Sequence, residues 1–188
     1  GATALGRGAS ARADNSIAVG SEAVTEGRES TALGRRSYAG AQSAAALGTG
    51  ANASGVVSTA VGNGAKASAV GASALGNTAD ASGRGSMAFG YASKASGVDA
   101  LASGSNANAS SMNAVAVGKD SNSSAVSAVV IGTQAKGTHE NSVTLGSYSS
   151  SAANNFDPTA KALSSFDDNA AGTTVNYNGT SSTQKGAV

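Results

Sequence analysis

Glycine recurs along this chain at a fixed interval of fourteen residues. It stands at eleven positions without one slip: Gly6, Gly20, Gly34, Gly48, Gly62, Gly76, Gly90, Gly104, Gly118, Gly132 and Gly146. The residue before each of these periodic glycines is large and apolar in ten of eleven cases, and the residue two before it is Ala in nine. Three residues after each glycine comes Ala or Ser, and five after it mostly Ala again. Such a strict period indicates a repeat protein rather than a flexible linker.

Each repeat contains two short segments with alternating small and larger residues, separated by glycine and small polar residues. Two strands and two turns therefore make one coil of fourteen residues. We expect an all-β fold, a parallel β-solenoid of about eleven coils in which the backbone of each coil hydrogen-bonds to the next. At about 4.8 Å per coil, the stack would be about 50 Å long.

The two faces of the first segment differ in size. Positions two and four before each glycine are small, as in Ala18 and Ser16, whereas positions one and three before it are bulkier, as in Phe89 and Met87. A fourteen-residue coil has room inside for Ala and Ser, so we place the small columns inside and the bulky columns outside. A long exposed apolar strip normally marks an interface. In the alternative arrangement, the bulky columns fill the interior and the Ala columns lie on the surface.

Composition supports a thin core. The chain of 188 residues has 42 Ala, 31 Ser and 26 Gly, which excludes a thick hydrophobic core and leaves burial to a regular stack or to an interface between chains. Twelve basic and eleven acidic residues give a net charge of +1, so we expect no nucleic-acid partner. The absence of Cys excludes disulfides and thiolate chemistry. No segment reaches the roughly 18 apolar residues of a membrane helix, so we expect no direct membrane insertion.

Three segments carry a family resemblance: Asn15–Ser21, Asn113–Gly118 and Asn141–Ser147. They resemble the repeat of the YadA-like head of trimeric autotransporter adhesins, Asn-Ser-Val-Ala-Ile-Gly followed by x-x-Ala/Ser-x-Ala. The resemblance covers residues 2 to about 151, so residues 1–151 are expected to form the head domain. It implies a left-handed parallel β-roll, three chains packed side by side as a homotrimer, and display on the cell surface at a Gram-negative outer membrane.

Residues 152–188 depart from the family pattern. Neither the neck sequence nor an apolar heptad follows Ser151. Asp157 and Pro158 instead predict an N-cap and the first position of a helix of one or two turns that reaches Leu163. Asn178 and Gly179 form a turn signal between β-prone residues. This region is expected to be either a cap on the open end of the solenoid or a poorly ordered segment.

The bulky columns supply the predicted trimer interface. Its residues are Val19, Leu33, Leu47, Val61, Leu75, Met87, Phe89, Leu101, Val115, Val117, Ile131, Val143 and Leu145. Phe89 is expected to lie above Ser103 of the next coil and to form an aromatic cluster with its copies in the other chains. The closest copies of the family's binding motif place ligand contacts at Asn15, Ser16, Ser21, Asn141, Ser142 and Ser147. The resemblance implies an extracellular-matrix ligand such as collagen, a host cell or another bacterium.

We expect no catalytic, metal or cofactor site, and no enzyme activity. His139 is the only histidine and is interpreted as a solvated turn residue. Hexapeptide acyltransferases also use left-handed coils, but their repeat is a multiple of six. Ice-binding solenoids carry a ladder of one residue type, whereas the column after the periodic glycines mixes Arg, Ser, Thr, Asn, Tyr and Lys. A structural spacer without its own ligand remains the main alternative to an adhesin head.

Overall fold

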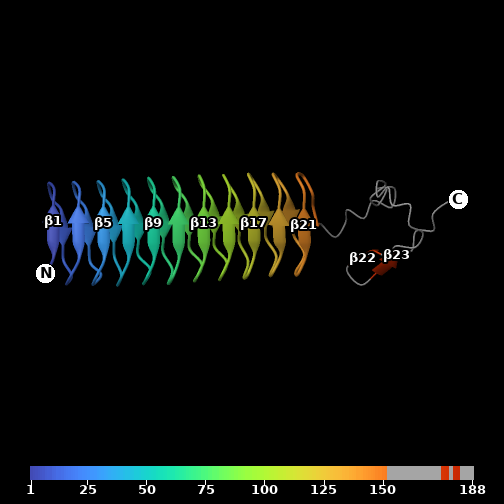
Figure 1. The fold of residues 1–188 in the computed structure, drawn as a ribbon, viewed down its shortest axis with the longest axis horizontal. Helices are drawn as coiled ribbons and strands as arrows, with labels where there is room; N and C mark the ends of the chain where they lie inside the picture. The colour runs from blue at the N-terminus through green and yellow to red at the C-terminus, as the bar shows by residue number, and fades with distance from the viewer. Residues whose placement is uncertain (152–174, 178–179, 183–188) are drawn as a thin grey trace. The chain divides into compact units, whose positions relative to one another are not determined.

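The computed structural model describes residues 1–151, 175–177 and 180–182. Residues 1–151 form the predicted all-β parallel solenoid, with two short strands in each coil (Figure 1). An eleven-stranded sheet contains β1 (Thr3–Leu5), β3 (Ile17–Val19), β5 (Thr31–Leu33), β7 (Ala45–Leu47), β9 (Thr59–Val61), β11 (Ser73–Leu75), β13 (Met87–Phe89), β15 (Leu101–Ser103), β17 (Val115–Val117), β19 (Val129–Ile131) and β21 (Val143–Leu145). A ten-stranded sheet contains β2 (Ser10–Ala11), β4 (Val24–Thr25), β6 (Tyr38–Ala39), β8 (Asn52–Ala53), β10 (Lys66–Ala67), β12 (Asp80–Ala81), β14 (Lys94–Ala95), β16 (Asn108–Ala109), β18 (Asn122–Ser123) and β20 (Lys136–Gly137).

The strands pair with a constant offset of fourteen residues. Ala18 therefore lies beside Ala32, and Phe89 lies beside Ser103 as the sequence predicts. The N–H of Ile17 donates to the Ser30 carbonyl at 2.9 Å, and the N–H of Gly20 donates to the Leu5 carbonyl at 2.8 Å. Each inner coil is thus bonded to the coil before it and to the coil after it. Equivalent side chains consequently form continuous columns along the solenoid.

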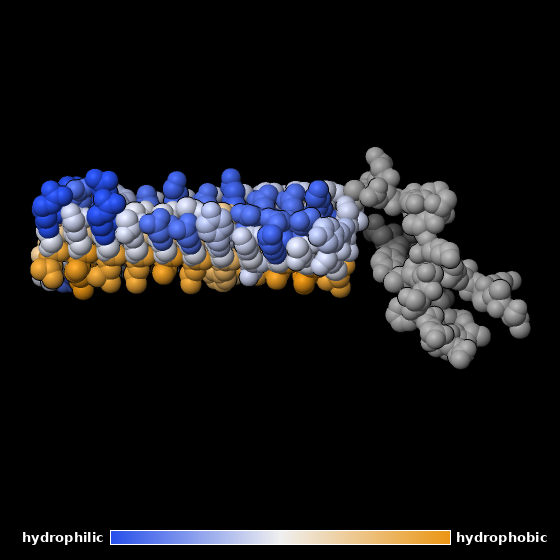
Figure 2. Space-filling model, turned by 90° about the horizontal axis from the view of Figure 1, so that it is seen from above, coloured by the Kyte–Doolittle hydropathy of each residue, from blue (hydrophilic) through white to orange (hydrophobic). Residues whose placement is uncertain are grey.

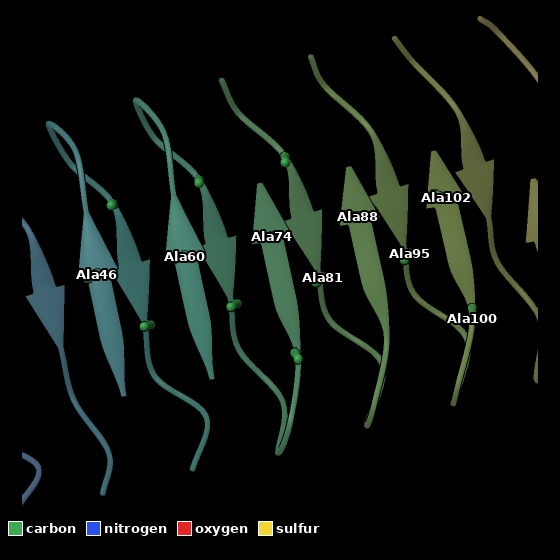
Figure 3. Packing of buried hydrophobic residues seen from close by; sticks show 14 of the residues in the cluster. Ala46, Ala60, Ala74, Ala81, Ala88, Ala95, Ala100 and Ala102 are labelled. Atoms are coloured by element: carbon green, nitrogen blue, oxygen red, sulfur yellow. The ribbon is translucent and has the colours of Figure 1, made fainter. Parts of the chain in front are cut away.

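The core between the two sheets consists of small side chains. Ala60, Ala74 and Ala88 from the odd-numbered strands and Ala67 and Ala81 from the even-numbered strands have no solvent-exposed surface. Figure 3 shows Ala60, Ala74, Ala81 and Ala88 in successive coils. The bulky residues on either side of the first of these columns lie outside the core, as in Leu75 and Met87. The prediction that small columns face inward is confirmed, and the reversed arrangement is wrong.

Two β-turns close each coil. In one coil, the N–H of Ala23 donates to the Gly20 carbonyl at 3.2 Å, and the N–H of Ser30 donates to the Gly27 carbonyl at 3.3 Å. The third residue of each turn, Glu22 or Glu29, has a φ of 60°, as in a type II turn. We call the turn that starts at the periodic glycine the glycine turn, and the other one the second turn.

The periodic glycines are required for coil stacking. Gly48 has a φ of 127°, and a Cβ there would approach the carbonyl oxygen of Gly62 in the next coil to 2.6 Å. Gly50, two residues on, has a φ of 65° and open space around it. Its equivalent Ala92 adopts a φ of 51°. Of these two positions in the glycine turn, the periodic one excludes other residues and the later one does not, which explains why the periodic glycine never varies.

Two larger core residues have local compensations. Val130 replaces the usual Ala of its column, and a Cβ at Gly137 in the same coil would collide with its Cγ2 atom. The core accommodates the Val130 side chain because the neighbouring residue, Gly137, has no side chain. Thr25 also replaces Ala, and its hydroxyl donates to Ser16 Oγ at 2.9 Å within the core. A polar group buried in this way is satisfied by its partner.

The C-terminal region has two described strands. β22 (Val175–Tyr177) pairs antiparallel with β23 (Thr180–Ser182), on either side of the predicted Asn-Gly turn. Residues 178–179 themselves, and the helix predicted from Asp157 to Leu163, lie outside the described residues. The prediction of a cap or a poorly ordered segment for residues 152–188 therefore stays a prediction.

Replacing Gly48 by Ala should lower the free energy of unfolding by about 1–3 kcal/mol, because the new Cβ meets a backbone carbonyl and the φ is one that almost only Gly adopts. Gly50→Ala is the matched control in the same coil and should cost clearly less. Urea unfolding followed by circular dichroism measures both. Equal losses in the two variants would contradict the assigned role of the periodic glycine.

A double-mutant cycle tests the compensation between Val130 and Gly137. Gly137→Ala should destabilise the protein by about 1–3 kcal/mol through overpacking. The same substitution in a Val130→Ala background should cost much less, because it restores the Ala pair present in other coils, such as Ala74 and Ala81. Denaturant unfolding of the four proteins gives the coupling energy. Additive effects would show that the two side chains do not share one space.

Candidate interaction surfaces

The outward residues of the odd-numbered strands, one and three before each periodic glycine, form one continuous apolar face. Leu33 is 37% exposed and Ile131 is 43% exposed, although both are aliphatic. Figure 2 shows the apolar face as an orange band along the length of the solenoid. Of the predicted interface residues, Leu33, Leu75, Met87, Ile131, Val143 and Leu145 are exposed, and Val19, Leu47, Val61, Phe89, Leu101, Val115 and Val117 are half-buried.

The apolar face is not covered by the rest of the described chain. Its residues pair in register with the equivalent residues of adjacent coils, as Leu33 does with Leu47, and none of the predicted interface residues is buried. Leu5 and Ile17 extend the face into the first coils and are also exposed. A contiguous apolar surface of this length is unusual on a monomeric protein and marks a site of association.

A second apolar stripe was missed by the sequence analysis. It lies eight residues after the periodic glycine, in the second turn, and we call it the second-turn stripe: Val56, Val70, Val98, Met112 and Val126. Val70 is 53% exposed and Met112 is 50% exposed. The signal for this stripe is present in the sequence, since an apolar residue recurs eight residues after the periodic glycine in five repeats.

The opposite surface is polar. At the positions two and four after the periodic glycines, none of the following residues is buried: Glu22, Val24, Arg36, Tyr38, Gly64, Lys66, Thr78, Asp80, Asn106, Asn108, Asp120 and Asn122. Side-chain contacts link successive coils here. Asn106 Nδ2 donates to Asp120 Oδ1 at 3.0 Å, and Asn108 Nδ2 donates to Asn122 Oδ1 at 3.1 Å.

Charged residues gather in the first three coils. Arg36 Nε donates to Glu22 Oε2 at 2.8 Å, and Arg7 approaches the other oxygen of that carboxylate at 3.4 Å. Hydrogen bonding and charge from Arg36 lower the pKa of Glu22. Because these groups are exposed, water and salt screen the interaction. The network therefore gives this end of the solenoid a fixed pattern of surface charge rather than a large part of its stability.

Glu26 is held by two donors from different coils. The Tyr38 hydroxyl donates to Glu26 Oε2 at 2.7 Å, and Arg12 Nη1 donates to Oε1 at 2.6 Å. The Tyr38 hydrogen bond, followed by that of Arg12, lowers the pKa of Glu26. The Tyr38 ring reaches this position across Gly40, where any Cβ would collide with it. The lack of a side chain at residue 40 thus permits the contact.

The candidate ligand residues occupy two distant places. Asn15 and Asn141 are exposed at equivalent positions of the second turn, each with a φ of 56°, but nine coils separate them. Ser147 is exposed, and Ser21 and Ser142 are half-buried. Ser16 is only 1% exposed, and its hydroxyl donates to the Ala13 carbonyl at 2.7 Å. The core position of Ser16 contradicts its predicted contact with a ligand.

The part of the chain that the structure describes has few side chains suited to catalysis or metal binding. Those residues include no cluster of three or more His, Asp or Glu side chains able to hold a metal ion. His139 is half-buried in a second turn, with Nδ1 3.3 Å from Thr138 Oγ1. Among the described residues, no helix is long and apolar enough to span a membrane.

Comparison with known families identifies the repeat. The family model described as YadA head domain repeat (2 copies) matches residues 1–23, 26–51, 39–65, 53–79, 81–107 and 95–121. These segments together cover more than half of the chain. Matches starting at residues 39 and 53, and at 81 and 95, differ by one fourteen-residue period. No curated protein matches the chain.

Proposed function

The chain belongs to the family of YadA head domain repeats, and we propose that residues 1–151 form the head of a homotrimeric adhesin on a bacterial cell surface. In this proposal the solenoid is a left-handed β-roll carried at the outer membrane. It attaches the cell to extracellular matrix, to host cells or to other bacteria. The head binds and performs no catalysis.

The exposed apolar face carries the proposal of a trimer. The interior of the solenoid is filled almost entirely by Ala and Ser, so the larger aliphatic side chains other than Val130 lie outside the core of their own chain. Complete burial of such a side chain contributes roughly 1.5–3 kcal/mol. The apolar face repeats this gain in almost every coil. Three chains that turn their apolar faces toward one axis would remove this surface from water.

The polar surface supports a binding role for the outside of the trimer. Its residues change from coil to coil while the backbone repeats, so charge and hydrogen-bonding groups are arrayed along a rod. A ligand that is itself extended and repetitive, such as a collagen-like matrix protein, can engage many weak sites at once and gain avidity. Asn15, Ser21, Asn141 and Ser147 are the surface residues proposed for direct contact.

Replacing Val61 or Val117 by Asp should dissociate or unfold the trimer, because three unpaired carboxylates would be brought close together in an apolar interface. Light scattering measures the mass of each variant. Asn63→Asp is the matched control, since Asn63 is exposed in the glycine turn of the same coil and should leave the mass unchanged. A wild-type protein that is a stable monomer, or a Val61→Asp trimer with unchanged melting, would contradict the proposed interface.

A solid-phase assay tests the adhesin function with the trimeric protein. We expect binding to at least one surface among collagen, fibronectin, laminin and whole cells. The double substitution Asn15→Ala/Asn141→Ala should reduce this binding several-fold. Asn113→Ala is the control, because Asn113 has the same backbone conformation in a repeat whose next residue is Ala114 rather than Ser. A trimer that binds none of these surfaces and does not self-associate would support the spacer function instead.

A further inference from the structure

The fold of a coil does not require an apolar residue at the position of the second-turn stripe. Its position accepts Asp14, Arg28 and Gln42 in the first three coils, Arg84 in a central coil and Glu140 in a later one. Coils with these polar residues form the same strands and turns as the coils with Val or Met. Five of the six coils from Val56 to Val126 nevertheless carry an apolar residue at this position. Each of these five residues is half-buried or exposed. Their chemistry therefore indicates contact with something outside the chain.

The stripe is continuous with the apolar face. The second turn leads directly into an odd-numbered strand, so Val70 lies three residues before Ser73, where β11 begins. The other border of the face is the glycine turn, which carries exposed polar residues such as Asn63 and Asn77. The apolar surface thus continues around one edge of the flattened coil and stops at the other. A surface of this shape has two distinct parts, a face and one edge.

A closed ring of three identical chains needs two such parts. In a ring, each chain uses one patch to contact the chain before it and a different patch to contact the chain after it. We propose that the second-turn stripe of each chain packs against the apolar face of the neighbouring chain, so that the three solenoids form a pinwheel. This inference rests on the trimer proposed above. It adds the second-turn stripe to the interface and states that the stripe of one chain contacts the apolar face of the next.

The stripe does not run the whole length of the solenoid. In the first three coils the second turn carries Asp14, Arg28 and Gln42 instead of apolar residues. The contact between edge and face would start near Val56 and continue to Val126. Arg84 interrupts it once, with a long aliphatic stem that lets its guanidinium reach water.

Cross-linking between introduced cysteines tests the pinwheel, because the chain has no cysteine of its own. The variant Val70→Cys/Leu75→Cys, treated with a short bismaleimide, should give covalent trimers on a denaturing gel. Each single-cysteine variant has one reactive group per chain and cannot give a covalent trimer. Thr78→Cys/Leu75→Cys is the control, with the first cysteine on the polar glycine turn instead, and should give no covalent trimers.

A charge substitution provides a second readout that does not depend on the cross-linker. Because Arg84 and Glu140 occupy the same position in other coils, Val70→Glu is compatible with the fold of one chain. It should weaken trimer association at least tenfold, whereas Thr78→Glu on the glycine turn should not. A wild-type trimer that forms no Val70–Leu75 cross-links and tolerates Val70→Glu would overturn the pinwheel alone. A monomeric wild type would overturn the trimer as well.

Discussion

The narrow space between the two sheets is the constraint on which the rest of this structure depends. A coil of fourteen residues brings its two strands so close that Ala and Ser fill the interior almost alone. The exception at Val130 shows how tight the space is, since the neighbouring Gly137 has no side chain and has no room for one. The other larger aliphatic residues of the described solenoid therefore lie outside the core. The long exposed apolar face follows from the width of the coil.

Backbone stacking allows the same fold to carry a variable surface. The carbonyl of each periodic glycine lies against the equivalent glycine of the coil before it, so this position cannot change. The turn positions beyond it tolerate Glu22, Arg36, Thr78 or Asp120 with nearly the same positive φ. Residues at these positions are consequently free to serve recognition. A rigid repeating backbone with variable turns is well suited to presenting ligand-binding groups in rows.

The surface of the solenoid divides into two parts with different tasks. The apolar face and the second-turn stripe lie together and belong to association between chains in the functions proposed here. The polar surface is linked from coil to coil by amide and ionic contacts, such as Asn108 with Asn122 and Arg36 with Glu22. In the first three coils these contacts favour the ionised carboxylates of Glu22 and Glu26. Negative charge on these two carboxylates is thereby maintained at the N-terminal end of the solenoid.

The coil, its period and the direction of each strand side chain follow from the sequence pattern alone. Period-two alternation places Ala18 inward and Val19 outward wherever the strand is regular, so the core and the apolar face were predictable. The same reasoning placed Ser16 inside, and its assignment as a ligand contact conflicted with that pattern. Ser16 lies in the core of this chain, where the narrow coil requires a small residue.

Only the tertiary structure decided what the turns contribute. A turn has no alternating pattern, since the direction of its side chains depends on the φ of each residue. The exposure of Val70 and its continuity with the apolar face were therefore not readable from the strand pattern. Contacts between coils, such as Tyr38 crossing Gly40 to reach Glu26, depend on residues twelve positions apart. Their meeting is set by the stacking of one coil on the next, which fixes distances that sequence spacing alone does not give.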